Sequence, residues 1–191
     1  MALLDDFHVA VVPSASYARL VSARRDATWR DALERPALYA RLVGTCVAIA
    51  ATGQASLALA ASTTAAWCWV VLLQLVIALV MTRISPARRN VSEARALELW
   101  FAGHVPWTLW MLLLAPAIRR YPTLPVEEIL FSMLVPIIWT FVIAGAFGKY
   151  VLGRSTATSF RLALIHQLAI IGLVLSYVAW SAGGWFRLVG P

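Results

Sequence analysis

The stretch LVGTCVAIAATGQASLALAASTTAAWCWVVLLQLVIALVMT, residues 42–82, contains no charged residue. A helix needs about 20 apolar residues to cross the hydrocarbon core of a bilayer. The stretch is therefore too long for one membrane span and has the length of two, and Ser62, Thr63 and Thr64 offer a polar turn between them. Because lipid supplies no water to satisfy the backbone, we expect both spans to be α-helices.

The composition of the whole chain agrees with a lipid environment. Of its 191 residues, 61% are hydrophobic and 13% are charged, whereas soluble domains are nearer half apolar and a quarter charged. Three further apolar runs also have the length of a span. We therefore predict an all-α, polytopic transmembrane helical bundle with five spans, at about 42–61, 65–82, 99–118, 129–148 and 162–182.

The basic residues are distributed unevenly between the two sides of this arrangement. Thirteen fall on one side: Arg19, Arg24, Arg25, Arg30, Arg35, Arg41, Arg83, Arg88, Arg89, Arg95, Lys149, Arg154 and Arg161. The other side carries Arg119, Arg120 and Arg187. Cytoplasmic loops are rich in Lys and Arg, so we expect the N-terminus in the cytoplasm and a short C-terminal tail, 183–191, outside. The preference for Arg and Ala is typical of a GC-rich bacterial genome, which indicates a bacterial inner (cytoplasmic) membrane.

Residues 1–41 form the main segment outside the predicted spans. Pro13 opens a stretch with an amphipathic pattern. Asp26 or Thr28 could cap a second short helix, and Thr28 followed by Asp31 has the spacing of a capping box. We expect this segment to lie on the cytoplasmic surface of the membrane. Lipid or interface anchoring is predicted for Trp29, Arg83, Arg88, Arg89, Trp67, Trp69, Trp180 and Trp185, with Tyr39 and Trp100 at the inner interface.

Two histidines stand out because the predicted span interiors contain no acid, lysine or arginine. His104 and His166 fall at similar depths in the third and fifth spans. Trp100, His104, Trp107 and Met111 share one helical face by spacing, which would suit a flat ring. The two imidazoles could hold haem b or bind a quinone. The alternative is that they reach water or a neighbouring carbonyl, and no cofactor is required by the sequence.

Small and polar residues predict how the spans pack. Gly44 and Ala48 in the first span, and Ala144 and Gly148 in the fourth, would allow close helix approach. Gln54 and Gln74 lie symmetrically about the turn at 62–64, so they could bond to each other in a helical hairpin or line a pore. Pro106 and Pro136 are expected to kink the third and fourth spans.

The order of these features resembles the Yip family of multispan membrane proteins, particularly its small bacterial relatives. The resemblance rests on a basic amphipathic segment at 13–41, on five closely spaced helices, and on IIWTFVIAGAFGKYVLG (137–153) followed by RSTATSFRLALIHQL (154–168). It implies a non-enzymatic protein of membrane organisation or partner binding. No functional residues are carried across by it.

The sequence contains no catalytic pattern, metal-ligand spacing or phosphate-binding loop, so we expect no enzyme. The net charge of +7 lies in loops and orients the chain, so nucleic acid is not an expected partner. The leading interpretation is a non-catalytic membrane subunit or scaffold that packs against lipid and against other integral membrane proteins or further copies of itself. The alternatives are an accessory subunit of a redox, photosynthetic or respiratory complex that uses His104 and His166, and a small solute facilitator.

Overall fold

The computed structural model describes residues 2–23, 26–52, 57–85, 91–121 and 125–188. These residues form helices joined by short connections, with no strand among them, which confirms the all-α prediction. The helices are α1 (Ala2–Val11), α2 (Pro13–Ser22), α3 (Trp29–Thr52), α4 (Leu57–Arg83), α5 (Glu93–Ala102), α6 (Val105–Arg120), α7 (Val126–Ser132), α8 (Leu134–Tyr150) and α9 (Thr156–Leu188).

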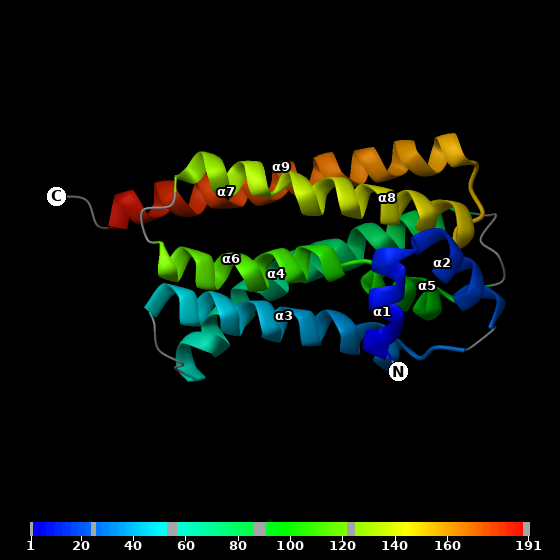
Figure 1. Cartoon of the computed structure of the whole chain (residues 1–191), viewed down its shortest axis with the longest axis horizontal. Coiled ribbons are helices and arrows are strands. Elements are labelled where there is room, and N and C mark those ends of the chain that lie inside the picture. The colour runs from blue at the N-terminus through cyan, green and yellow to red at the C-terminus, as the bar shows by residue number, and fades with distance from the viewer. Residues whose placement is uncertain (1, 24–25, 53–56, 86–90, 122–124, 189–191) are drawn as a thin grey trace.

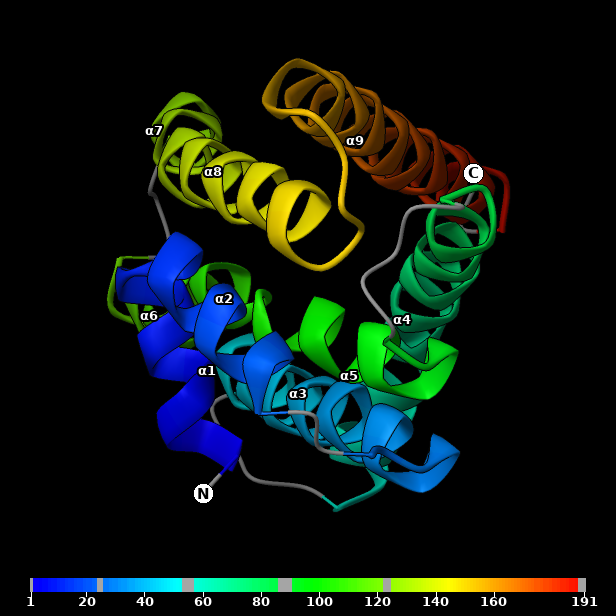
Figure 2. The same ribbon diagram turned by 90° about the vertical axis from the view of Figure 1, so that its right-hand side faces the viewer.

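The longer helices lie roughly parallel to one axis, and the short helices α1, α2 and α5 gather at one end of it (Figure 1). Along this axis α3, α4, the α5–α6 pair, the α7–α8 pair and α9 run in alternating directions, so α1 and the end of α9 lie toward opposite ends of the bundle. Figure 2 looks onto the N-terminal end, where α1 and α2 lie across the ends of the long helices. The most extensive packing joins α3 with α4, α5 and α6, and α8 with α9 and α2.

Two prolines divide long helical runs. Proline lacks the N–H that would bond to the carbonyl four residues earlier. Accordingly α5 ends at Ala102, four residues before Pro106, and α7 ends at Ser132, four residues before Pro136. At the first break the chain tightens, with bonds from Gly103 N to the Trp100 carbonyl and from His104 N to the Phe101 carbonyl. The kinks expected at both prolines are confirmed.

The turn predicted at 62–64 is wrong. Helix α4 begins at Leu57 and passes through Ser62, Thr63 and Thr64 without a break. The connection from α3 falls at 53–56 instead, outside the described residues. Serine and threonine have only modestly lower helix propensity than alanine, so in a run where unsatisfied backbone groups are costly they do not suffice to end a helix.

The N-terminal segment is not separate from the bundle. The capping box is confirmed, because Thr28 N donates to Asp31 Oδ2 at 2.8 Å and Asp31 N donates to Thr28 Oγ1 at 3.3 Å. The helix that follows is not short, however: α3 continues from Trp29 to Thr52 and crosses the predicted boundary at 41–42. At the other end α9 extends to Leu188, so most of the predicted outer tail is helical.

Large apolar side chains cover the outward faces of the bundle. The exposed ones on its long helices include Trp69, Leu72, Val76 and Val80 on α4, Phe131, Val135, Ile138 and Val142 on α7–α8, and Leu164, Ile165 and Leu168 on α9. Within the described residues, one helical stretch, Glu127–Tyr150, is both long and apolar enough to cross a membrane, and Cys68–Arg83 is a shorter apolar helix. The structure therefore supports membrane association, and the number of spans is taken up as a proposal below.

Candidate functional site: a polar cavity beside a buried ionic network

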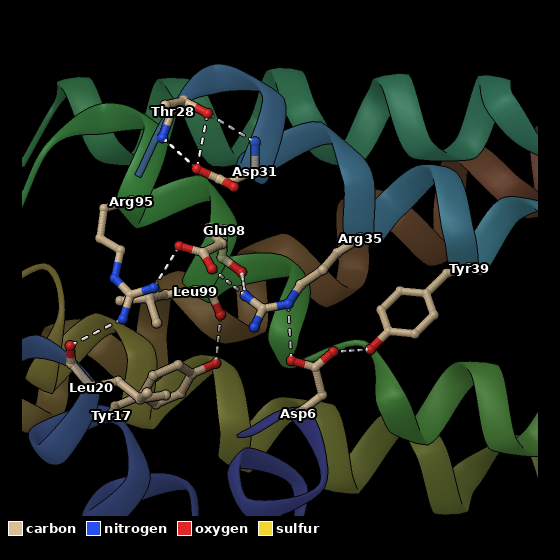
Figure 3. A network of polar contacts seen from close by, with 10 residues as sticks. All are labelled: Asp6, Tyr17, Leu20, Thr28, Asp31, Arg35, Tyr39, Arg95, Glu98 and Leu99. Carbon is tan, nitrogen blue, oxygen red and sulfur yellow. Dashed lines mark hydrogen bonds and ion pairs between the residues drawn. The ribbon is translucent and has the colours of Figure 1, made fainter. Parts of the chain in front are cut away.

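Four charged side chains form a buried network at the N-terminal end of the bundle (Figure 3). Arg35 on α3 lies between two acids, with its Nε 3.0 Å from Asp6 Oδ1 on α1 and its Nη1 3.2 Å from Glu98 Oε1 on α5. Arg95, one turn before Glu98, pairs with the second oxygen of that carboxylate. All four side chains are less than a tenth exposed. Two positive and two negative charges balance, so the network is neutral when fully ionised.

Hydrogen bonds to the backbone extend the network to α2. Arg35 Nη1 also donates to the Glu98 carbonyl at 2.9 Å, and Arg95 Nη2 donates to the carbonyl of Leu20 at 3.2 Å. The Tyr17 hydroxyl donates to the Leu99 carbonyl at 3.2 Å. The α1–α2 hairpin is thus fastened to α3 and α5 by charge-assisted bonds, which are the stronger kind in proteins.

Burial changes the pKa of Asp6 and of the two tyrosines beside it. It raises the pKa of the Asp6 carboxyl above its usual value, although the Arg35 guanidinium and the hydrogen bond from Tyr39 act in the opposite direction. Burial and the nearby Asp6 charge also raise the pKa values of Tyr17 and Tyr39. Both phenols therefore remain protonated donors, and the Tyr39 hydroxyl gives Asp6 Oδ2 a bond of 2.6 Å.

The raised pKa of Asp6 predicts a pH-dependent contribution to stability. The folded protein holds this proton more tightly than the unfolded chain, so the contribution is present at low pH and declines as pH rises above 3.8, the ordinary carboxyl value. The quantity to compare is the free energy of unfolding of the wild type minus that of Asp6→Asn. We expect this difference to fall as pH rises, by about 1.4 kcal/mol for each unit by which the pKa of Asp6 is raised. Urea titration in mixed micelles at a series of pH values measures this difference. A difference that rises with pH would contradict the assignment.

The sequence interpretation missed this network. It placed Asp6, Arg35, Arg95 and Glu98 outside the spans as loop charges, whereas the structure buries all four. The side chains of Tyr39 and Trp100, predicted to lie at the inner interface, are likewise buried between helices. A local signal for part of the network does exist, because Arg95 and Glu98 stand three residues apart, where helical side chains of opposite charge meet. No local rule pairs them with Asp6 and Arg35, which lie far away in sequence.

A small cavity lies deeper in the bundle and contains both predicted histidines. Its volume is about 20 Å³. The lining residues come from α2, α4, the α5–α6 break, α8 and α9: Tyr17, Gln74, Trp100, Gly103, His104, Trp107, Thr140, Ile143, Ala144, His166 and Gln167. The structure therefore brings His104 and His166 together as the sequence suggested, along with Trp100 and Trp107. Met111, which shares their helical face by spacing, is not among the lining residues.

Hydrogen bonds organise the polar side chains of the cavity. His166 Nε2 lies 2.9 Å from Gln74 Oε1, which joins α9 to α4. Gln167 Nε2 donates to Thr140 Oγ1 at 2.6 Å, which joins α9 to α8. His104 Nδ1 lies 3.2 Å from the Trp100 carbonyl. The hydrogen-bond partner of Gln74 is thus His166 on α9. The predicted partner of Gln74 was Gln54, which lies outside the described residues.

The geometry bears on the haem and quinone alternatives. The Trp100 indole contacts both imidazoles edge to face, with ring centroids 5.7 Å from His104 and 4.7 Å from His166. Sites for ligands of drug size have volumes of about 300–1,000 Å³, whereas this cavity holds about 20 Å³. A haem or quinone site would need these helices to separate, and that reading stays a prediction. Among the described residues no group of three or more His, Cys, Asp or Glu is placed to hold a metal ion.

The small residues predicted to mediate packing lie between helices of this chain. A Cβ added to Gly44 would fall 2.7 Å from the Cα of Thr64 on α4, and one added to Gly148 would fall 2.8 Å from the Cβ of Ser159 on α9. Ala48 and Ala144 are buried. Gly44 and Gly148 therefore allow close approach between helices of this chain, as the sequence predicted.

The predicted anchoring residues divide into three groups. Trp29, Trp69 and Arg83 are exposed, and Arg83 pairs with Glu93 at 3.5 Å. Trp67, Trp180 and Trp185 lie on α4 and α9, but their side chains are outside the described part of the structure, as are Arg88 and Arg89 altogether. Anchoring by lipid remains a prediction for all of them.

Comparisons with known proteins give no family for the chain. No protein-family model matches it, and neither the curated proteins nor the solved structures contain a significant match. The resemblance to the Yip family therefore stays a prediction.

Proposed function

We propose that the chain is an integral protein of a bacterial inner membrane, crosses the bilayer five times and acts there as a non-catalytic subunit or scaffold. The observation that carries the proposal is the reversed polarity of the bundle. Gln74, Thr140, His166 and Gln167 are buried in its interior, while large apolar side chains cover the outward faces of α4, α8 and α9. This pattern suits a bundle surrounded by hydrocarbon, in which polar side chains face inward.

The course of the chain supports five crossings. Each of α3, α4, α5–α6, α7–α8 and α9 runs along the bundle axis in the direction opposite to the one before it. A helix rises 1.5 Å per residue, so the 27-residue α4 and the 33-residue α9 would reach about 40 Å and about 50 Å, more than the roughly 30 Å hydrocarbon core. In α3 the charged residues end at Arg41, and the helix is apolar from Leu42 to Thr52. The break at Gly103–His104 lies inside the protein, where irregular backbone is tolerated. At Met133, which is half-buried, the backbone N–H still donates to the carbonyls of Ile129 and Leu130.

The basic residues support a cytoplasmic N-terminus, although fewer of them are free than the sequence indicated. Arg35 and Arg95 belong to the buried network, and Arg154 donates to the Ser85 hydroxyl and to the Ile84 carbonyl at the end of α4. Exposed basic side chains at the same end include Arg19, Arg30, Arg83, Lys149 and Arg161, and Arg41 is exposed halfway along α3. Positive charge near a membrane surface favours the cytoplasmic leaflet.

Site-specific labelling tests this topology. In a variant with Cys46 and Cys68 replaced by serine, a single cysteine is introduced at Arg30, Glu127 or Lys149, all of which are exposed. We expect a membrane-impermeant maleimide to label Glu127→Cys in intact spheroplasts, and Arg30→Cys and Lys149→Cys after lysis alone, because loops do not cross the bilayer spontaneously. Labelling of Arg30→Cys and Glu127→Cys from the same side would overturn the five-span topology.

The subunit role predicts contact of an outward apolar face with a defined protein. Leu72 on α4, Ile138 on α8 and Leu168 on α9 are more than half exposed and point away from the bundle. A photoreactive phenylalanine at one or more of these positions should give an adduct of constant mass in living cells, either with another protein or with a second copy. The control position is Trp139, whose indole donates to the Ala10 carbonyl within the chain at 2.7 Å and should give internal adducts alone.

Failure of all three outward positions to give a protein adduct would contradict the subunit role while leaving the topology intact. The facilitator and redox alternatives stay predictions. Flux of a small solute into liposomes that depends on Gln74 would favour the first, and a Soret band lost in His104→Ala or His166→Ala would favour the second.

A further inference from the structure

The histidine-lined cavity contains a buried acceptor without a partner. Gln74 Oε1 is an acceptor, so His166 Nε2 carries the hydrogen in their 2.9 Å bond. In the neutral ring this leaves Nδ1 of His166 as an unprotonated acceptor. The Nδ1 atom is buried and has no hydrogen-bond partner among the described residues. The His166 side chain as a whole is 6% exposed.

A buried donor lines the same cavity. Trp100 is 4% exposed, and its Nε1–H also lacks a partner in the described part of the chain. The indole and the His166 imidazole contact each other edge to face at 4.7 Å. His104 adds a second acceptor, because its Nδ1 donates to the Trp100 carbonyl and its Nε2 is left unprotonated. Trp100, His166 and His104 thus offer the cavity one donor and two acceptors.

The size and charge of the cavity restrict what can satisfy these groups. Its volume of about 20 Å³ exceeds the roughly 10–15 Å³ that one water molecule requires, and a buried water usually makes two to four hydrogen bonds. No acid, lysine or arginine is among the lining residues that the structure describes. A neutral molecule of water size that both donates and accepts is therefore favoured over an ion or a ring.

We propose that this cavity binds one small neutral molecule, either water or ammonia. The bound molecule donates to His166 Nδ1 and accepts from Trp100 Nε1–H, and His104 is a second acceptor. Both molecules have the size and the donor-to-acceptor balance that the cavity requires. Unpaired buried polar groups are rare and call for a partner, and inside a membrane such groups usually mark a function. The inference does not depend on the number of spans or on the subunit role.

Magic-angle-spinning NMR of the full chain in lipid bilayers, with isotope-labelled histidine, tests the site. The chain has three histidines, and the exposed His8 serves as an internal reference for contact with bulk water. We expect an unprotonated Nδ1 resonance for His166 and magnetisation transfer to its ring from a bound, slowly exchanging water. Absence of that transfer, in ammonium-free buffer and in the presence of ammonium chloride alike, would overturn the proposal.

Matched variants identify the donor and the occupant. Trp100→Phe removes the unpartnered N–H, whereas Trp110→Phe removes an indole N–H that donates to Ser132 Oγ at 3.0 Å outside the cavity. The transfer to His166 should be lost in Trp100→Phe and kept in Trp110→Phe.

Ammonium chloride identifies the occupant. A shift of the His166 resonances when ammonium chloride is added at mildly alkaline pH, with no such shift on adding sodium chloride, would identify ammonia. Equal loss in both variants, or a Soret band in the wild type, would overturn the assignment.

Discussion

Replacing Arg35 with methionine should lower the free energy of unfolding by about 3–5 kcal/mol, the usual cost of removing one partner from a buried ion pair. Methionine keeps much of the length of the side chain but none of its charge. Asp6 loses its cationic partner, and Glu98 keeps Arg95 alone. Most of the cost comes from leaving a buried carboxylate uncompensated rather than from the intrinsic strength of the pair. Urea titration in mixed micelles, monitored by tryptophan fluorescence, measures the change.

Two further variants test whether the destabilisation comes from the buried network or from the loss of any arginine on α3. Arg30→Met breaks an exposed pair with Glu34 on the same helix, and exposed pairs contribute little to stability. Asp6→Asn combined with Arg35→Met removes the unpaired acid, so it should be more stable than Arg35→Met alone. Equal destabilisation by Arg30→Met and Arg35→Met, or no recovery in the double variant, would show that the buried network does not hold the hairpin in place.

Gly44→Ala should destabilise the bundle by about 1–3 kcal/mol, as overpacking of a close contact does. The added Cβ would lie 2.4 Å from Thr64 Oγ1, and 2.7 Å from both the Cα and the N of Thr64. Backbone atoms cannot rotate away as a side chain can, so α3 and α4 would have to separate. The same measurement of unfolding in mixed micelles reports the loss.

Gly172→Ala is the matched control for this substitution. A Cβ at Gly172 on α9 would meet no atom of the described residues within 4 Å, and alanine has a higher helix propensity by about 1 kcal/mol. The control should therefore be neutral or stabilising. Thr64→Ala added to Gly44→Ala should not restore stability, because the clash with the Thr64 backbone remains. Full recovery in that double variant would show that the contact is with the hydroxyl alone.

Local rules located the features that depend on residues close in sequence. The Thr28–Asp31 cap and the breaks before Pro106 and Pro136 each follow from backbone groups within four residues. The proline rule does not place every break, however, because Pro36 and Pro116 lie inside α3 and α6 without ending them. The same rules failed at Ser62–Thr64, because the hydroxyl residues weaken a helix only slightly and the helix continued. They also did not predict that α3 runs without a break from Trp29 to Thr52, across the predicted boundary at 41–42.

The sequence by itself determined that the chain is all-helical and strongly apolar, with basic residues gathered on one side of the apolar runs. Only the tertiary structure decided which polar groups meet. Arg35 pairs with Asp6 and Glu98. His166 lies within hydrogen-bond distance of Gln74, which is 92 positions away in the sequence. The physical reason is that the spacing of residues fixes which side chains share a face of one helix, whereas the rotation and crossing of the helices decide which faces are brought together.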